Sequence, residues 1–392
     1  MMQIGIIGSG AMGSGIAQVA ATAGHTVVLY DTNQEALVRA RTQLEHILHR
    51  LVEKGRMTGQ EVTDILQRHQ FVDTMDAFRE CGLVIEAIVE NLDIKRSVFQ
   101  TLESIVTREA ILATNTSSLS IASIAAACQA PERVIGLHFF NPAPLMKLVE
   151  IIPALQTDPG LPSTLHQLML SWGKYPVQAR DTPGFIVNRI ARPFYSESIR
   201  ILEEGLGTKE EIDTAMKTIG GFRMGPFELM DFIGHDVNYA VTESVWTACY
   251  FEPRYQPSFT QRRLVDAGWL GRKSGRGFYD YRLGASPVET TGPGDSEKLR
   301  RIYERIVVML INEAADALYY NIASRDDIDQ AMTLGVNYPK GLLRWADEWG
   351  IATCEARMDR LFNNYHDPRY RCSPMLKSLA QQGERFYPNE NI

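Results

Sequence analysis

The chain has 392 residues, a length that predicts two or three domains rather than one compact core. Its hydrophobic content of 45% and charged content of 22% are typical of a soluble globular protein, and a formal net charge of −7 argues against nucleic acid as the main partner. No apolar run is long enough to cross a bilayer, so we expect no membrane partner.

The N-terminal segment predicts a nucleotide-binding turn. Residues 3–7 form an almost continuously apolar run, as expected of a parallel strand that is covered on both faces. The sequence GSGAMG at 8–13 leads from this strand into a helical stretch. Gly8 permits the tight turn, Gly10 lets a pyrophosphate approach the backbone, and Gly13 lets helix and strand pack closely. We therefore expect NAD to contact the residues Gly8, Gly10, Ala11, Met12 and Gly13.

A second predicted strand, Thr26–Tyr30, leads directly into Asp31, 18 positions after Gly13. A carboxylate at this place accepts hydrogen bonds from the ribose hydroxyls of the dinucleotide. It would also repel the 2′-phosphate of NADP. Asp31 therefore favours NAD over NADP.

Further strands predict a doubly wound α/β sheet of the Rossmann-like kind. The apolar segments alternate with helical stretches, which is typical of a parallel sheet with helices on both faces. The expected strands are Leu83–Glu86, Ile111–Thr114, Val134–Leu137 and Val149–Ile152.

Residues 33–56 predict a long helix or a helix pair that carries basic residues near its end. One interpretation is a patch that binds ligand phosphates, with Lys54 as a substrate-binding residue. The other is a solvated helix face, which is at least as common for an isolated basic residue.

The segment HFFNPAPLMKLVE at 138–150 contains the candidate catalytic pair. His138 and Glu150 lie at the ends of two apolar segments, and the loop between them lets the carboxylate fold back toward the imidazole. A carboxylate on one ring nitrogen would fix the tautomer and leave the other nitrogen to take a proton. Beside a nicotinamide site, such a pair suits the oxidation of a secondary alcohol.

Polar residues after two other elements are further candidates. Ser117 follows the strand 111–114 at the sheet edge where doubly wound folds bind ligands, although Asn and Ser there can simply form a turn. Asn188 follows the chain break Asp181-Thr-Pro183-Gly184, in the first turns of a predicted long helix. Its alternative role is that of a helix-capping amide.

With these motifs in place, the chain resembles the L-3-hydroxyacyl-CoA dehydrogenase family. The resemblance covers residues 1 to about 282 and rests on the segments GSGAMGSGIAQ, EAIVENLDIK, ATNTSSLSI, GLHFFNPAPLMKLVEII, DTPGFIVNR and GPFELMDFIG. It implies an NAD-dependent oxidation of a (3S)-3-hydroxyacyl thioester of coenzyme A, as in fatty acid beta-oxidation. It implies His138 as the catalytic base and Glu150 as its partner. For the rest of the site it implies that Ser117 and Asn188 bind the reacting oxygen with Asn141 nearby, and that Asn115, Glu90 and Lys95 belong to the NAD site.

The C-terminal part contains an internal repeat. Asp329 follows Asp213 by 116 positions in a similar Ile-Asp-x-Ala-Met context, and Asp347 follows Asp231 by the same 116 positions. We expect four segments: an NAD-binding domain at 1–182, an all-α domain at 183–282, a linker at 283–296, and a degenerate second all-α copy at 297–392. The second copy lacks a counterpart of Asn188, so we expect no second active site.

The repeat also suggests a partner surface inside the chain. The helix expected at 185–204 would pack against the helix expected at 300–320, so that the two helical copies form an internal pseudo-dimer. The sequence does not decide whether the whole chain forms a homo-oligomer as well.

Arg223 is a candidate for substrate selection. It lies at a position where the family usually carries proline, just before the GPFEL turn. We hypothesise that it favours an acyl chain that ends in a carboxylate; the alternative is an ordinary exposed arginine.

Two other functions are compatible with a nucleotide fold of this kind. One is a dehydrogenase of a free hydroxy acid or sugar acid, as in the lambda-crystallin group, and the other is a non-catalytic NAD-binding structural protein. A structural role would need none of Ser117, His138, Glu150 and Asn188, so their joint presence favours the enzyme.

The cysteines indicate a reducing compartment and no metal site. They are odd in number and show neither a CxxC motif nor the spacing of metal ligands. We therefore expect reduced thiols and a cytoplasmic location. The cysteines are Cys81, Cys128, Cys249, Cys354 and Cys372.

Overall fold

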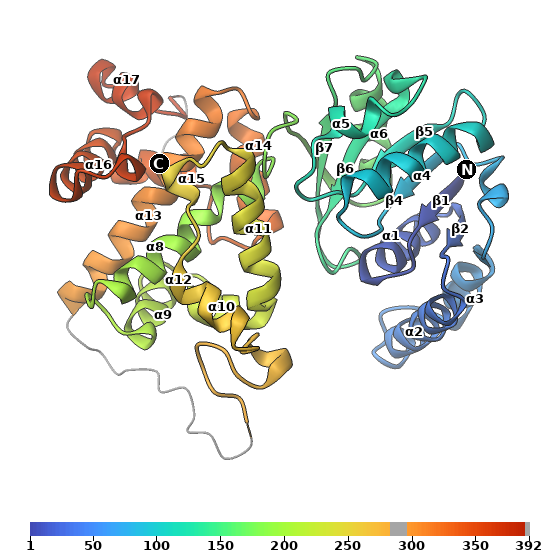
Figure 1. The fold of residues 1–392 in the computed structure, drawn as a ribbon, viewed down its shortest axis with the longest axis horizontal. Coiled ribbons are helices and arrows are strands. Elements are labelled where there is room, and N and C mark those ends of the chain that lie inside the picture. Colours follow the sequence, from blue (N-terminus) through green and yellow to red (C-terminus); the bar gives the residue numbers. More distant parts are fainter. Residues whose placement is uncertain (283–295, 389–392) are drawn as a thin grey trace. The chain divides into compact units, whose positions relative to one another are not determined.

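The computed structural model describes residues 1–282 and 296–388. The chain divides into two compact units, residues 1–185 and 186–392 (Figure 1). The predicted linker lies outside the described residues, apart from Ser296, which begins a helix. The four-segment division with its boundaries stays a prediction. Within the described ranges, no helix is both long and apolar enough to span a bilayer.

An eight-stranded sheet forms the first unit, in the order β3-β2-β1-β4-β5-β6-β7-β8. The strands predicted from apolar runs are confirmed, whereas β3 and β8 were not predicted. The two missed strands are only four residues long, and β3 is only partly buried. The strands are β1 (Gln3–Ile7), β2 (Thr26–Tyr30), β3 (His69–Val72), β4 (Leu83–Glu86), β5 (Ile111–Thr114), β6 (Val134–Phe139), β7 (Leu148–Pro153) and β8 (Tyr175–Gln178).

The predicted doubly wound sheet is confirmed, and one pair of its strands departs from the parallel arrangement. β6 and β7 run antiparallel, while the other strand pairs are parallel. Residues 140–147 are too few to form the crossover that a parallel pair needs, so the chain returns as a hairpin. The register of this hairpin places His138 directly opposite Glu150.

Helices cover both faces of this sheet. One hydrophobic cluster joins α1, α2, α3 and α6 to alternate strand residues such as Ile4 and Ile6. The buried residues of α4 and α5 lie outside that cluster; α5 packs on β6, where Ile121 contacts Gly136 on the opposite face. The helices are α1 (Ala11–Thr22), α2 (Gln34–Glu53), α3 (Gly59–Gln67), α4 (Leu92–Ile105), α5 (Ile121–Ala125) and α6 (Leu161–Ser171).

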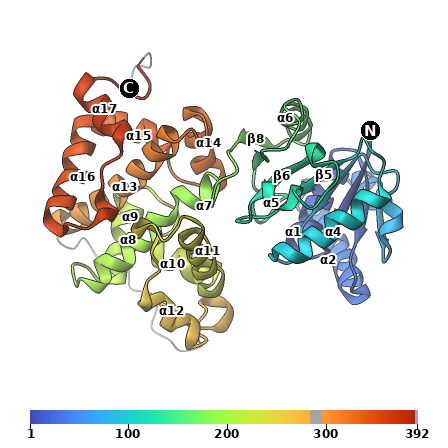
Figure 2. The same cartoon turned by 45° about the horizontal axis from the view of Figure 1, so that its top comes forward.

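The second unit is built mainly from helices joined by turns and loops (Figure 2). Its longest helix, α13, is buried over most of its length and packs against α8, α9, α15, α16 and α17. The first copy contains α7 (Val187–Ile190), α8 (Arg192–Glu203), α9 (Lys209–Thr218), α10 (Pro226–Ile233), α11 (His235–Ala248) and α12 (Phe259–Asp266). The second contains α13 (Ser296–Tyr319), α14 (Arg325–Gly335), α15 (Leu342–Trp349), α16 (Ile351–Tyr365) and α17 (Pro374–Gln382).

The repeat is visible in equivalent hydrogen bonds as well as in helix order. Asp213 in α9 accepts hydrogen bonds of 2.9 and 3.0 Å from two backbone N–H groups at the start of α10. Asp329 in α14 accepts bonds of 2.8 and 3.1 Å from the start of α15. A Cβ atom at Gly225 or Gly341 would lie 2.3 or 2.2 Å from the carboxyl carbon of the corresponding aspartate. The same Asp–Gly hydrogen-bond motif therefore joins two helices in each copy.

A second pair of aspartates anchors the end of each copy. Asp231 accepts hydrogen bonds from the backbone N–H groups of residues 278 and 279, and Asp347 accepts them from residues 386 and 387. The aspartates differ by 116 positions but the anchored segments by only 108, because the second copy lacks the GRKSGRG loop. The C-terminal segment thus completes the second copy although its sequence has lost the loop.

The two copies contact each other through reciprocal ion pairs. Arg189 Nε lies 3.1 Å from Glu313 Oε1, and Arg305 Nε lies 2.6 Å from Glu197 Oε1. Arg305 follows Arg189 by 116 positions, and Glu313 follows Glu197 by the same 116 positions; both glutamates are fully buried. Such exchange of equivalent contacts is the mark of a two-fold arrangement. A tyrosine hydroxyl also donates to each glutamate, from Tyr255 to Glu313 and from Tyr370 to Glu197.

Candidate active site

The glycine-rich turn has the shape that a dinucleotide requires. Gly8 has a φ of +97°, and a Cβ atom there would lie 2.6 Å from the carbonyl oxygen of Ala87. A Cβ atom at Gly13 would lie 1.8 Å from the Gly8 carbonyl oxygen, which shows how closely the helix approaches the turn. Around Gly10 the space is open, and α1 begins there without an acidic residue in its first turn. The turn therefore fits the pyrophosphate of NAD.

Asp31 is already fixed beside this turn. Its Oδ2 accepts hydrogen bonds of 2.8 Å from the backbone N–H and from the hydroxyl of Ser9, and its Oδ1 accepts one of 3.0 Å from Asn33 N–H. Burial alone would raise the pKa of Asp31, but these hydrogen bonds hold it below its ordinary value. A fixed carboxylate at the end of β2 suits a ribose and disfavours a 2′-phosphate.

His138 and Glu150 form a buried pair at the end of β6. The Nδ1 atom of His138 lies 2.6 Å from Glu150 Oε2, and the exposed fractions are 6% for the histidine and 0% for the glutamate. Because a carboxylate only accepts hydrogen bonds, Nδ1 carries the proton and Nε2 remains an acceptor. The hairpin register holds both side chains on one face of the sheet.

Two aromatic side chains enclose the imidazole. The ring centroid of Phe140 lies 4.5 Å from that of His138, and the centroid of Phe185 lies 5.9 Å away. Phe185 has a φ of +47°, a left-handed conformation that is uncommon for an aromatic residue. Phe185 was not predicted as a site residue, although the preceding Pro183-Gly184 pair indicates an unusual backbone.

The loop after β5 lies at the same carboxyl edge of the sheet. Asn115 Oδ1 accepts a 2.8 Å hydrogen bond from the N–H of Phe139, the residue after His138. Ser117 follows two positions later and is half-buried. Since β1, β4, β5 and β6 are parallel, the glycine-rich turn and the histidine also lie at this edge.

Glu90 joins this loop to the preceding one. Its carboxylate accepts hydrogen bonds from the Thr116 hydroxyl at 2.6 Å and from the N–H groups of Ser117 and Ser118 at 3.1 and 3.2 Å. Burial raises the pKa of Glu90, but the ammonium of Lys95 and these hydrogen bonds outweigh it and hold the pKa below its ordinary value.

Lys95 is only 1% exposed and lies between two carboxylates. Its Nζ is 2.6 Å from Glu86 Oε1 and 3.3 Å from Glu90 Oε2. Glu86, which was not predicted as a site residue, also accepts a 2.7 Å hydrogen bond from the Thr114 hydroxyl. The sequence could have indicated this role, because a buried acidic residue at the end of the apolar strand LVIE needs a hydrogen-bonding or cationic partner.

A buried lysine that was not predicted from the sequence binds the turn between β6 and β7. Lys174, 8% exposed, donates a 2.8 Å hydrogen bond from Nζ to the Met146 carbonyl oxygen and another to that of Ala143. Asn141 lies in this turn, is exposed, and precedes a cis proline bond.

The remaining predicted residues lie on elements of both units. Lys54 ends α2 and is exposed, and Arg223 in the second unit is exposed as well. Asn188 lies in α7 of the second unit, and its carbonyl oxygen accepts a 2.8 Å hydrogen bond from Arg192 Nε. The structure thus brings together two groups of predicted residues, His138 with Glu150 and Glu90 with Ser117 and Lys95.

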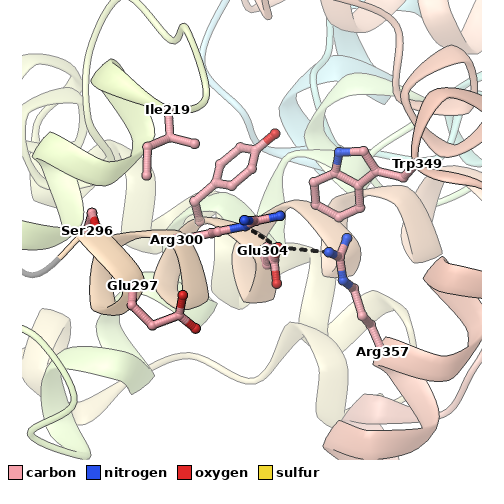
Figure 3. A pocket seen from close by; sticks show the side chains of 8 residues that line it. Ile219, Ser296, Glu297, Arg300, Glu304, Trp349 and Arg357 are labelled. Atoms are coloured by element: carbon pink, nitrogen blue, oxygen red, sulfur yellow. Dashed lines mark hydrogen bonds and ion pairs between the residues drawn. The ribbon is translucent and has the colours of Figure 1, made fainter.

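A surface pocket of about 620 Å³ lies in the helical unit (Figure 3). Glu304 Oε1 is 3.1 Å from Arg300 and 2.8 Å from Arg357, and Trp349 and Ile219 also line the pocket. None of the predicted site residues lines this pocket. Glu304 is 116 positions after Asn188, so it occupies the position in the second copy at which the first copy carries that asparagine.

Comparison with known sequences decides the family. The NAD-binding domain of 3-hydroxyacyl-CoA dehydrogenase matches residues 3–182, and the C-terminal domain of the same enzyme matches twice, at 184–281 and 302–387. The chain belongs to the 3-hydroxyacyl-CoA dehydrogenase family. It is an NAD-dependent oxidoreductase, and the double match agrees with the tandem helical copies.

Relatives of this dehydrogenase family come with one or two helical copies. A 3-hydroxyadipyl-CoA dehydrogenase of Escherichia coli K12 is 40% identical over 96% of this chain and 97% of its own. A probable 3-hydroxybutyryl-CoA dehydrogenase of Deinococcus radiodurans is 44% identical over 71% of this chain and all of its own. Among crystal structures, a 3-hydroxybutyryl-CoA dehydrogenase of Escherichia coli K12 has a TM-score of 0.92 at 38% identity, covering 97% of this chain and 98% of that one.

Proposed function

We propose that this dehydrogenase interconverts (3S)-3-hydroxyacyl-CoA and 3-oxoacyl-CoA, with His138 as the general base. The observation that carries the proposal is the buried His138–Glu150 pair at the sheet edge that also carries the dinucleotide turn. A base and a hydride acceptor at one edge are the two requirements for oxidising a secondary alcohol.

Each part of the reaction has a residue to serve it. Nε2 of His138 takes the hydroxyl proton as the C3–H bond breaks, and the carbonyl forms from the electrons of the O–H bond. Glu150 holds Nδ1–H, so that it fixes the tautomer and stabilises the imidazolium that results. NAD, when bound, accepts the hydride. In the reverse direction His138 returns its proton to the new alkoxide oxygen.

Ser117 and Asn188 are proposed to donate hydrogen bonds to the reacting oxygen, where negative charge develops. Glu90, which binds the loop of Ser117, and Asn115 are proposed to serve the nicotinamide side of the NAD site. Lys95 would act on that side through Glu90, because its ammonium is enclosed.

Two exposed residues complete the proposed substrate contacts. Asn141, in the turn after His138, would lie near the reacting oxygen, and Lys54 at the end of α2 would contact a phosphate of coenzyme A. Both side chains are accessible to a ligand, and a solvated ammonium suits a phosphate.

The test is the reduction of acetoacetyl-CoA with NADH by the wild type and by His138→Gln. We expect fast turnover in the wild type and a loss of about 10³-fold or more in the variant, because glutamine cannot transfer the proton that His138 donates during reduction. Free acetoacetate is the matched control substrate. Turnover of the free acid at an equal rate would favour the hydroxy-acid alternative, and an active variant would show that the base is another residue.

The helical copies are proposed to form a pseudo-dimer within the chain. Support comes from the reciprocal pairs Arg189–Glu313 and Arg305–Glu197, and from the packing of α8 on α13. A chain shortened to residues 1–282 would expose this face, so we expect it to self-associate or precipitate. If it stayed monomeric and fully active, the second copy would have no pairing role.

A cytoplasmic location is proposed on the state of the thiols. All five cysteines are free. Burial raises the pKa of Cys81, Cys354 and Cys372 to about 12, so these thiols are unreactive near neutral pH. Unpaired structural thiols are typical of a reducing compartment.

A further inference from the structure

Arg192 is a buried arginine without a carboxylate partner. It begins α8, is 4% exposed, and donates from Nε to the Asn188 carbonyl oxygen at 2.8 Å and from Nη1 to the Thr242 hydroxyl at 3.0 Å. No carboxylate among the described residues forms an ion pair with it, and its Nη2 group has no hydrogen-bond partner there. A buried guanidinium keeps its charge and normally requires a counter-ion.

The other polar groups beside Arg192 are neutral phenols. The guanidinium carbon of Arg192 lies 5.0 Å from the ring centroid of Tyr195. Tyr338 is the other side chain that interacts electrostatically with the guanidinium. Burial raises the pKa of both tyrosines above the ordinary value, so neither supplies a negative charge near neutral pH. The positive charge of Arg192 is therefore uncompensated by these neighbours.

Tyr338 adds a second unsatisfied group at the same place. It is 5% exposed, and its hydroxyl has no hydrogen-bond partner in the described part of the chain. Its ring packs against Phe222 with a centroid distance of 5.0 Å and against Phe194 at 5.7 Å. Tyr338 belongs to the second helical copy and Arg192 to the first, so the two copies jointly supply an unpaired cation and an unpaired hydroxyl within an aromatic environment.

The position relative to Asn188 suggests what the missing partner is. Arg192 follows Asn188 by four residues, about one helical turn, which corresponds to roughly 6 Å along an α-helix. Asn188 is the proposed ligand of the oxygen on C3. In an extended acyl chain, C6 lies roughly 4 Å from C3, and the oxygens of a carboxylate at C6 reach about 1 Å further. A carboxylate at C6 would thus lie within reach of the guanidinium.

We propose that Arg192 and Tyr338 form a specificity site for a carboxylate at the far end of the acyl chain. The preferred substrate class is then a 3-hydroxydicarboxyl-CoA of about six acyl carbons. This inference rests on the proposed function and names the substrate class of the same site. It assigns the second helical copy a direct role in substrate selection.

The test compares two substrates of equal chain length, (3S)-3-hydroxyadipyl-CoA and (3S)-3-hydroxyhexanoyl-CoA, with the full-length protein and NAD. The readout is the ratio of their kcat/KM values, because a folding defect lowers both values and leaves the ratio unchanged. The variants are Arg192→Met, Tyr338→Phe and, as the competing candidate, Arg223→Met.

We expect the wild type to prefer the adipyl substrate. Arg192→Met should lower the ratio between about 10- and 150-fold, as for the loss of a hydrogen bond to a charged group, and Tyr338→Phe about 2- to 12-fold. Tyr338→Phe removes one oxygen only, so it decides the question if Arg192→Met does not fold. Arg223→Met should change the ratio by less than about threefold, as for an exposed arginine.

Three results would overturn the inference. The first is a wild-type ratio near one with good turnover of the hexanoyl substrate, which leaves the proposed function intact. The second is a ratio that neither Arg192→Met nor Tyr338→Phe changes. The third is a ratio that depends on Arg223 instead. A wild type inactive on both thioesters would refute the proposed function itself.

Discussion

The substitution Glu150→Gln would test the central pair of the site. It removes one negative charge and keeps the size of the side chain, in a hairpin that holds Glu150 Oε2 2.6 Å from His138 Nδ1. When His138 takes the proton, the charge centres of the two groups are about 4 Å apart, which at an effective dielectric constant near 20 corresponds to about 4 kcal/mol. The amide oxygen can still accept from Nδ1, so part of this energy is retained. We therefore expect kcat to fall about 10²- to 10³-fold.

The assay is the initial rate of NADH formation from (3S)-3-hydroxybutyryl-CoA at saturating substrate and NAD. Thermal unfolding of each variant would show whether the hairpin is intact. Glu132→Gln is the matched control, because Glu132 is an exposed carboxylate of the same unit. If kcat of Glu150→Gln stayed within threefold of the wild type, the carboxylate would have no part in stabilising the imidazolium.

Three further predictions concern stability and cofactor choice. In urea unfolding, Lys174→Met should lower the free energy of unfolding by about 2 kcal/mol, because two carbonyls of the β6–β7 turn lose a charged donor. Lys147 is exposed, so the control Lys147→Met should change the free energy of unfolding by less than about 0.5 kcal/mol. Burial lowers the pKa of Lys174 from 10.5 to about 8, so the unfolded chain binds more protons between these pH values. Wild-type stability should therefore rise across that window, and an equal rise in Lys174→Met would contradict this assignment. Arg305→Met should lower the free energy of unfolding by about 3 kcal/mol, because buried Glu197 loses the cation 2.6 Å away and keeps Arg200 at 3.5 Å. Adding Glu197→Gln should restore part of the loss, and strictly additive effects would refute the pairing. Asp31→Ser should lower the kcat/KM ratio of NAD to NADP about 10- to 150-fold, and an unchanged ratio would mean that Asp31 does not bind the ribose.

The fold could be predicted where a local pattern decides it. Apolar runs identified β1, β2, β4 and β5, because a strand buried on both faces leaves little room for polar residues. They missed β3, whose sequence HQFV carries polar side chains on a partly buried edge. The direction of β7 depends on the length of a connection and on pairing across the sheet, which a pattern of strands and helices alone does not reveal.

The candidate site shows the same division. His138 and Glu150 could be paired from sequence, because a short turn between two apolar segments forces them to face each other. Lys174 could not be connected to that turn, because its contacts span 28 and 31 positions and depend on the packing of β8 beside β7. Arg192 and Tyr338 are 146 positions apart and meet only through the pairing of two helical copies.

The reciprocal ion pairs of the helical unit have a consequence for the history of the gene. Two identical chains that associate must carry every substitution twice, once in each subunit, and they separate on dilution. Here both halves of the interface are covalently joined, so Arg189–Glu313 and Arg305–Glu197 form at any protein concentration. Equivalent positions are also free to differ, as Asn188 and Glu304 do. A tandem repeat can therefore keep the proposed reaction residue Asn188 in one copy while the equivalent position of the other copy differs.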